Sequence, residues 1–415
     1  MTNDAGDAAV GADARNWQTP PYNRWAFWNV DRILPVRTIP RAAAPHPLPE
    51  RPAPDLLQTT LTDVTGAPTT VGAVFERTYT DAYLIVRDGA VVAEWYCAAG
   101  GPERTHAIMS ITKSIVGCVA GGLVADGLLD PERPVTDYAT ELAGSGYAGA
   151  RVRDVLDMRT GVIFREEYLD PASEIRAMAD WLGWQAPYGA PRAGGLYGFL
   201  GSLGRGGEHG GPFVYRSADS DVLGWVCERV AGLPMDVLIR ERIWRPMGAA
   251  ADALMLCDTN RTPVHDGGLA VTARDLARFG RVLAHGGVEP DGSSHVVPPR
   301  WLRQVWTVDA GARAAFAASP SEAAMPGGWY RNQFWVRPDA RGHDVVLGIG
   351  IYGQLLFVDR ATGTVGVKFS SWPAPQVPAY LEDTFRAFAA VAAGTAGTTS
   401  QRPPSSPPVS PVRPL

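Results

Sequence analysis

The chain has 415 residues, enough for one large domain or two interleaved ones. Its 46% hydrophobic and 20% charged residues are typical of a globular enzyme and exclude a fibrous or largely disordered protein. The net charge of -5 gives no electrostatic reason to expect nucleic acid or an anionic membrane as a partner.

The two ends of the chain are expected to be disordered tails. Residues 1–16 are polar, acidic and rich in Ala and Gly, without the basic and apolar regions of a secretory signal. Residues 394–415 are rich in Pro, Ser and Thr and cannot bury a core. The four scattered cysteines are typical of reduced thiols, and no apolar run approaches the roughly 18 residues of a membrane span, so a cytoplasmic location is expected.

A single catalytic domain is expected over residues 17–393. It begins with an irregular aromatic segment, residues 17–28, that should lie against the body of the domain. Residues 82–87 and 90–97 are β-rich runs around Asp88-Gly89, which predicts a hairpin. Residues 110–126 have helical periodicity and end before Gly127, a favourable C-cap.

The remaining elements follow in the same order. Helices are expected over residues 152–158, 172–181, 217–231 and 272–285, and a long glycine-rich loop over residues 188–212. Strands are expected over residues 333–336, 345–352, 354–358 and 364–370, before a last helix over residues 377–392.

This order predicts an α/β (α+β) fold in which both ends of the chain build one antiparallel sheet flanked by helices. The sheet lobe would comprise about residues 17–105 and 250–393, and a mainly helical lobe, about residues 106–249, would be inserted. A cleft between two such lobes is a natural place for an active site.

Lysine is nearly absent, since only Lys113 and Lys368 are lysine among 38 Lys and Arg residues. Arginine stays protonated, whereas a lysine can lose its proton when it is desolvated or close to another charge. Lys113 follows Ser110 by three residues at a predicted helix start, which places both side chains on one face. A neutral amine there would serve as the base that activates the serine, and the alternative is a surface lysine. For Lys368, in the last strand, we expect a structural partner.

Tyr215 directly follows the glycine-rich loop and directly precedes a predicted helix. A tyrosine beside an ammonium group can exchange protons with a leaving group. A buried aromatic ring with a satisfied hydroxyl is an equal alternative on position alone.

The chain resembles the serine β-lactamase and penicillin-binding protein superfamily in three motifs. These are Ser-x-x-Lys at a helix start, Tyr215-Arg216-Ser217, and a late glycine-rich strand. Within its class C and esterase-like branch, the chain is most similar to the 6-aminohexanoate-dimer hydrolases. The similar segments are residues 17–27 (WQTPPYNRWAF), 109–114 (MSITKS), 167–174 (EYLDPASE), 215–221 (YRSADSD), 273–278 (ARDLAR), 348–354 (GIGIYGQ) and 370–373 (SSWP).

The resemblance implies a β-lactamase-like fold and a serine hydrolase that forms an acyl-enzyme on an ester or a linear amide. Ser110 would be the nucleophile, and Lys113 with Tyr215 the general base and acid. The backbone N–H of Ser110 and one from Ile351 to Gln354 would form the oxyanion hole. The resemblance also implies that Tyr168 closes over the substrate.

Two departures from the superfamily bear on the substrate. The third motif reads Tyr352-Gly353-Gln354 instead of Lys-Thr-Gly, so this strand lacks the cation that would hold a β-lactam or peptide carboxylate. The second motif carries Ser217 in place of Asn. Both differences favour an esterase or amidase over a β-lactamase.

A carboxylate is expected in the cleft if the substrate is a linear amide with a free amine. Asp180 and Asp266 are candidates, although each is more often a solvated charge. Trp181 and Trp184 are candidates to cap an apolar acyl site, with core packing as the alternative. His265 would line the cleft or be satisfied by backbone groups.

Other signatures were weak. Residues 348–353 match G-x-G-x-x-G, but a strand follows where a dinucleotide site requires a helix. The seven histidines have no paired metal spacing, and no G-x-S-x-G is present, so no metal or cofactor is expected and an α/β-hydrolase is disfavoured.

Three functions thus remain to be distinguished. An amidase or carboxylesterase is favoured; a β-lactamase or D-Ala-D-Ala carboxypeptidase and a non-catalytic binder of the same fold are the alternatives. The expected partner is a small ester or amide, with neither nucleic acid nor membrane, and a homodimer is compatible with the sequence.

Overall fold

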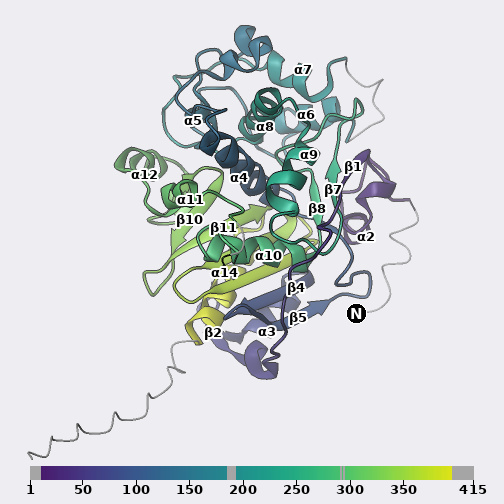
Figure 1. Ribbon diagram of the computed structural model, residues 1–415. Helices are drawn as coiled ribbons and strands as arrows, with labels where there is room; N and C mark the ends of the chain where they lie inside the picture. Colours follow the sequence, from purple (N-terminus) through teal and green to yellow (C-terminus); the bar gives the residue numbers. More distant parts are fainter. Residues whose placement is uncertain (1–10, 185–192, 290–291, 293–294, 395–415) are drawn as a thin grey trace, which may run out of the picture.

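The computed structural model describes residues 11–184, 193–289, 292 and 295–394 (Figure 1). Its centre is a seven-stranded antiparallel sheet in the order β5-β4-β13-β12-β11-β10-β9. These strands are β4 (Thr80–Arg87), β5 (Ala90–Tyr96), β9 (Trp329–Arg331), β10 (Phe334–Pro338), β11 (Asp344–Gly350), β12 (Gln354–Asp359) and β13 (Thr364–Ser370).

Both ends of the chain meet in the middle of this sheet. Strand β4 pairs with β13 from Val86 opposite Val365 to Thr80 opposite Ser370. The predicted antiparallel sheet and the hairpin at Asp88-Gly89 are therefore confirmed.

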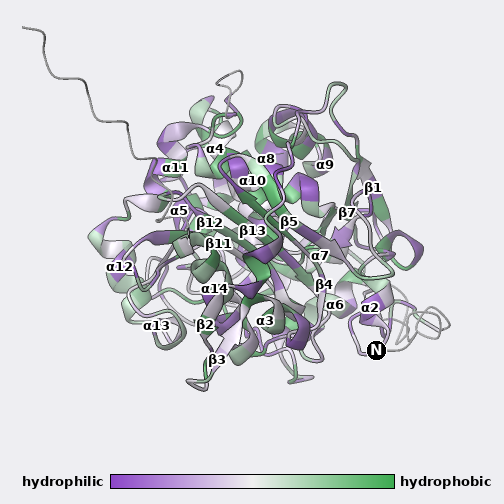
Figure 2. Cartoon of the chain, turned by 90° about the horizontal axis from the view of Figure 1, so that it is seen from below, coloured by the Kyte–Doolittle hydropathy of each residue, from purple (hydrophilic) through white to green (hydrophobic). Residues whose placement is uncertain are grey.

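The alternating side chains of the sheet pack into two separate apolar cores. Leu84 and Val86 face the larger core, on the side where α4 (Ile111–Ala125) and α10 (Ala273–Ala284) pack against the strands. Tyr83 and Ile85 face the smaller core under α3 (Val71–Arg77) and α14 (Pro378–Ala393). Seen from below in Figure 2, apolar strands occupy the interior and hydrophilic residues gather toward the outside.

The helical middle of the chain forms the upper part of the molecule in Figure 1. It contains α5 (Val152–Leu156), α6 (Glu174–Leu182), α7 (Gly195–Ser202), α8 (Ser217–Ala231) and α9 (Met235–Ile239). Helix α4 packs directly against α8, so the two helices that carry Lys113 and Ser217 are neighbours.

Smaller elements complete the described chain. A four-stranded sheet has the order β1-β7-β8-β6, formed by β1 (Val36–Ile39), β6 (His106–Ala107), β7 (Ala253–Leu256) and β8 (Leu269–Val271). The others are α2 (Asn23–Ala26), β2 (Thr60–Thr62), β3 (Pro68–Thr70), α11 (Pro299–Trp306), α12 (Ala310–Ala317) and α13 (Ser321–Ala324).

The N-terminal aromatic segment lies against the body of the domain, as predicted. The Trp17 ring meets Trp184 edge-on at 5.6 Å between ring centroids, and Phe27 is fully buried. The Asn23 amide donates to the carbonyl of Trp372 at 3.1 Å, which fastens α2 to the segment after β13.

Two expectations about irregular chain were wrong. The predicted loop over residues 188–212 contains α7, whose Leu196, Phe199 and Leu200 are buried and stabilise a glycine-rich helix through packing. Residues 11–16, expected in the tail, form turns in which the Trp17 amide donates to the Asp13 carbonyl at 3.0 Å. Residues 1–10, 188–192 and 395–415 of the predicted tails and loop lie outside the described residues.

No helix in the described part of the chain is long and apolar enough to cross a membrane. All four cysteines are free thiols, as expected from their spacing.

Candidate active site

Ser110 stands at a sharp bend immediately before α4. Met109 adopts a left-handed φ of 48°, which is uncommon for a residue with a side chain and turns the chain from β6 into the helix. Gly350, at the end of β11, packs closely against the backbone of Ile108. A Cβ at position 350 would lie only 2.6 Å from the Ile108 carbonyl oxygen. The end of β11 therefore abuts the segment that presents Ser110.

Lys113 points from the first turn of α4 to the Ser110 hydroxyl, as predicted. Its Nζ lies 2.8 Å from Ser110 Oγ, and the residue is only 1% exposed. It also donates to Ser217 Oγ at 3.1 Å and to the Asp266 carbonyl oxygen at 2.9 Å. Three acceptors for three N–H bonds are what an ammonium group requires.

The charges around Lys113 hold its proton. Burial alone would lower the pKa of this amine, but Tyr215, Asp266 and Glu166 outweigh burial and raise the pKa above its ordinary value. Asp266 Oδ2 lies 3.4 Å from Nζ. These contacts favour the ammonium form of the resting side chain, whereas a neutral base is expected from the sequence.

Tyr215 lies beside the same two groups. Its ring stacks on Trp335 with centroids 5.1 Å apart, and Lys113 Nζ lies 5.2 Å from the ring centre. The pKa of the phenol is raised above its ordinary value, mainly by burial and also by the Glu166 carboxylate, and the charge of Lys113 and hydrogen bonds with Ser110 and Lys113 only partly oppose this. The structure therefore brings Ser110, Lys113 and Tyr215 together.

Glu166 is the site residue that the sequence reasoning missed. Its carboxylate accepts from the Ser217 amide at 2.7 Å, the Ser217 hydroxyl at 2.9 Å and the Tyr168 hydroxyl at 2.6 Å. Burial raises the pKa of this carboxyl, and Lys113 opposes the shift. In the sequence, the only local indication that Glu166 belongs to the site is its position two residues before Tyr168. Its contacts with α8 join residues far apart in the chain and leave no sequence pattern.

Two backbone amides are suited to bind an oxyanion. Among the described residues, the N–H groups of Ser110 and Ile351 donate to no other group. The Tyr352 amide, in contrast, donates to the Pro375 carbonyl at 2.8 Å. Ile351 is therefore the better donor from the predicted strand end, and Tyr352 contributes its side chain.

Tyr352 forms the turn between β11 and β12. It has a left-handed φ of 62°, and its ring packs on Phe27 with centroids 5.5 Å apart. Gln354 fixes the next strand, since its amide donates to the Ser370 carbonyl at 2.7 Å. The third motif thus supplies aromatic surface and backbone rather than a cation.

The remaining candidates separate into two groups. Asp266 is mostly buried against Lys113, whereas Asp180 is exposed on α6.

Trp184 is buried and donates to the Cys257 carbonyl at 3.0 Å, which favours core packing, and Trp181 meets Phe199 edge-on. His265 is fully buried next to carboxylates, so the expectations of a cleft-lining or backbone-satisfied histidine were both wrong.

Lys368, the second lysine, is buried in β13 away from this group. Its Nζ donates to the Thr78 carbonyl at 3.1 Å and to the Ser370 hydroxyl. These contacts agree with the structural partner expected for it.

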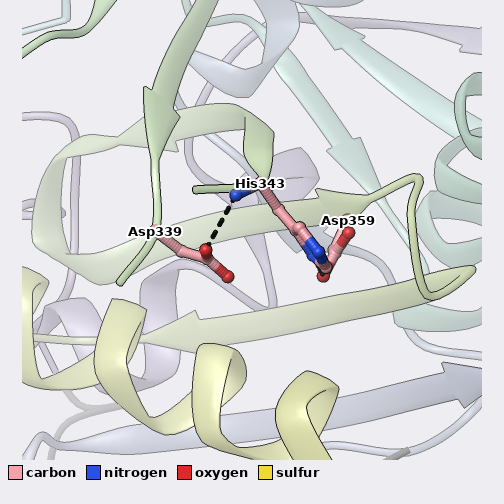
Figure 3. A group of neighbouring side chains, drawn as sticks. All are labelled: Asp339, His343 and Asp359. Atoms are coloured by element: carbon pink, nitrogen blue, oxygen red, sulfur yellow. Dashed lines mark hydrogen bonds and ion pairs between the residues drawn. The ribbon is translucent and has the colours of Figure 1, made fainter. Parts of the chain in front are cut away.

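Three potential metal ligands, Asp339, His343 and Asp359, lie close together after β10 and at the end of β12 (Figure 3). Arg341 already bonds to both carboxylates, at 2.8 Å from Asp339 and 2.6 Å from Asp359. Backbone amides, among them that of His343 at 3.0 Å, occupy the other oxygens. The cluster is best explained as an arginine-centred turn that closes the β10–β11 connection.

Comparison with known proteins identifies the family. The beta-lactamase family matches residues 73–391. The chain belongs to the beta-lactamase family. A 6-aminohexanoate-dimer hydrolase from Paenarthrobacter ureafaciens is 39% identical over 370 residues, which cover 89% of this chain and 91% of the relative. The chain is accordingly a serine hydrolase that acts on amide or ester bonds.

Solved structures share the beta-lactamase fold. A Bacillus anthracis protein assigned as a 6-aminohexanoate-dimer hydrolase has a TM-score of 0.79 and 22% identity, with 93% of this chain and 95% of that chain covered. EstCE1, a hydrolase with promiscuous acyltransferase activity, has a TM-score of 0.61 and 18% identity, with 78% and 97% covered. At these identities the likeness concerns the fold alone.

Proposed function

We propose that this protein hydrolyses linear amides and carboxylic esters through an acyl-enzyme on Ser110. The observation that carries the proposal is the 2.8 Å contact between Lys113 Nζ and Ser110 Oγ inside a buried site at a helix N-terminus. A serine hydroxyl becomes an effective nucleophile only when a neighbouring group takes its proton.

The proton passes through Tyr215 with Lys113 as its charged partner. The reactive form of the pair is the one in which Tyr215 has given up its proton to solvent, a form that the neighbouring Lys113 charge favours although burial raises the pKa of the phenol. In this form Tyr215 accepts the proton of Ser110 while Oγ bonds to the substrate carbonyl carbon. The same proton is then delivered from Tyr215 to the leaving amine or alkoxide as the C–N or C–O bond breaks. A water molecule repeats the sequence in the second half, giving its proton to Tyr215 and releasing the acid and Ser110.

The amides of Ser110 and Ile351 stabilise the oxyanion of both tetrahedral intermediates. One comes from a helix N-terminus and the other from a strand end, so both are fixed before the reaction starts. Loss of a single donor of this kind lowers kcat by about 100- to 1,000-fold in serine hydrolases.

The surroundings favour a neutral or amine-bearing substrate. The third motif has no cation, while Glu166 and Asp266 place two carboxylates around Lys113. The 39% identical relative is named for the 6-aminohexanoate dimer, a linear amide, and we propose linear amides of this class as substrates. Exposed Asp180 on α6 is the carboxylate we propose for a free substrate amine.

A substrate panel tests the proposal directly. Wild-type protein and Ser110→Ala are compared on a p-nitrophenyl ester, a linear 6-aminohexanoyl amide and nitrocefin. We expect turnover of the ester and the amide by the wild type and none by Ser110→Ala. Turnover of nitrocefin alone would favour a β-lactamase, and no turnover of any substrate would favour a non-catalytic binder.

A further inference from the structure

Behind the catalytic group, α8 and the loop at residues 265–266 enclose a charged cluster that the proposed reaction does not use. Its members are Asp221, Glu228 and His265, and Asp221 and His265 are fully buried. Buried charges are stabilised only when they are paired, so this cluster must have a specific arrangement.

Asp221 holds the loop that carries Asp266. One of its oxygens, Oδ1, accepts from the His265 amide at 2.9 Å and from the Asp266 amide at 3.0 Å. The carbonyl of Asp266 in turn accepts from Lys113 Nζ at 2.9 Å. Two hydrogen bonds, both made by the backbone of Asp266, therefore connect Asp221 to the ammonium group beside Ser110.

His265 lies between two carboxylates of the same helix. Its Nδ1 is 3.7 Å from Asp221 Oδ1, and its Nε2 is 3.4 Å from Glu228 Oε1. Burial would lower the pKa of the imidazole, but Asp221 and Glu228 outweigh burial and raise it to about 9. Burial raises the pKa of Asp221 to about 6, and the Asp266 carboxylate adds to this shift.

The other neighbours of His265 confine its ring. Tyr197 of α7 stacks parallel to it at 6.3 Å and bonds to Glu228. Gly224 of α8 lies against the ring, since a Cβ there would be 2.0 Å from His265 Cγ. The titratable groups that face the imidazole are thus Asp221, Glu228 and Tyr197, with Asp266 and Lys113 beyond Asp221.

We propose that Asp221 and protonated His265 are positioning residues for catalysis, which hold the Asp266 carbonyl and carboxylate on Lys113. Loss of the imidazolium charge leaves Asp221 and Asp266 in mutual repulsion and displaces the loop from Lys113. The proton-transfer pair then loses the partner that orients it. This inference rests on the proposed reaction at Ser110.

Glu228→Gln gives the most specific test, because this variant removes a carboxylate that contacts the His265 side chain but neither Asp266 nor Lys113. We expect wild-type kcat/KM for a p-nitrophenyl ester to fall above about pH 9, where His265 loses its proton. Glu228→Gln should move this alkaline limb to lower pH by at least half a unit, with KM within about twofold. His265→Gln should abolish the limb and lower kcat about tenfold at pH 7.5.

Asp275→Asn is the matched control. Asp275 is another buried carboxylate that accepts from two consecutive amides, Ala250 at 2.8 Å and Ala251 at 3.0 Å, but it lies in α10 outside this cluster. The Asp275→Asn variant should have a lower Tm, but the alkaline limb of its kcat/KM profile should not move. An unchanged limb in Glu228→Gln, or an equal shift in Asp275→Asn, would overturn the positioning role.

The proposed function is checked separately in the same samples. A fluorophosphonate adduct on Ser110 of the wild type is required before the pH profiles are compared. Its absence contradicts the acyl-enzyme, whereas a normal adduct with unmoved profiles contradicts only the role of the cluster.

Discussion

At the scale of single residues, the site is organised around one buried ammonium group. Lys113 has acceptors for all three N–H bonds, and carboxylates raise its pKa. Ser110 is therefore an acceptor toward Lys113 in the resting state, which leaves its own proton for Tyr215. In the proposed reaction the lysine stabilises a charged partner rather than acting alone as a neutral base.

Lys113→Arg should abolish most of the activity, although it keeps the positive charge. A guanidinium group is larger and planar, so it cannot place its donors at the same three acceptor positions. We expect kcat/KM for a p-nitrophenyl ester to fall by at least about 100-fold. Lys368→Arg is a control at the only other lysine, and activity of Lys113→Arg within threefold of the wild type would refute this role.

Tyr215→Phe removes one hydroxyl and keeps the ring that stacks on Trp335. Because general acid–base catalysis contributes about 100- to 10,000-fold, kcat should fall by a factor in that range. Thermal unfolding should change little, since the stacked ring is retained. Full activity in stopped-flow or steady-state assays would mean that another group transfers the proton.

At the scale of elements, α8 is the helix that joins the catalytic group to the charged cluster. Ser217, Asp221, Gly224 and Glu228 follow one another at helical spacings of four, three and four residues, so they share one face. Ser217 contacts Lys113, while the next positions surround His265. A small change in the position of α8 therefore acts on both groups at once.

Gly224→Ala should disturb this face through a single methyl group. The added Cβ would lie 2.0 Å from His265 Cγ, so either α8 or the 265–266 loop must move. We expect a loss of about 1–3 kcal/mol in the free energy of unfolding, as for overpacked cores, together with lower kcat. Gly201→Ala in α7 meets no atom within 4 Å and should be neutral or stabilising, which makes it the control. Equal stability of both variants in urea unfolding would contradict the close packing.

The elements that could be predicted from sequence are those with strong local signals. The 82–97 hairpin has a turn at Asp88-Gly89, and α8 was expected over the residues that form it. The four-stranded sheet was missed, because strands of two to four residues such as β6 have no measurable periodicity. Helix α7 was missed because packing, rather than propensity, makes its glycines helical.

The contacts of the candidate site also differ in whether they follow from the local sequence. Ser110 and Lys113 are three residues apart on one helix, so their contact follows from local geometry. Glu166 reaches Ser217 across 51 positions, and Asp221 reaches His265 across 44, so no spacing rule connects them. The pKa of Lys113 depends in part on these distant carboxylates, so its protonation state does not follow from the local sequence.

At the scale of the whole molecule, the two lysines occupy opposite electrostatic environments. Lys113 has carboxylates around it, whereas burial lowers the pKa of Lys368 to about 7, although Asp81 opposes this shift. The arginine-rich composition leaves lysine at two fully buried positions. One lies at the active site and the other in the sheet that joins both ends of the chain.

Lys368 should make the stability of the molecule depend on pH. Its pKa is about 7 when folded and 10.5 when unfolded, so the unfolded state binds more protons between these values. The contribution of neutral Lys368 to the free energy of unfolding is therefore fully present above pH 10.5 and is lost as the pH falls toward 7. Lys368→Met, which cannot titrate, should therefore gain stability relative to the wild type over this window, by up to about 4 kcal/mol. Urea unfolding at pH 7 and 10 measures the difference, and a constant gap between the two proteins would rule out the burial of a neutral amine.

The measurement that tests the central claim most directly is intact-protein and peptide mass spectrometry after brief exposure to a fluorophosphonate or a slowly deacylating ester. Wild-type protein should gain one adduct, located on Ser110, and Lys113→Arg and Tyr215→Phe should gain it far more slowly. Ser110→Ala should gain none. An adduct on another residue, or none on the wild type, would contradict the assignment of Ser110 as the nucleophile.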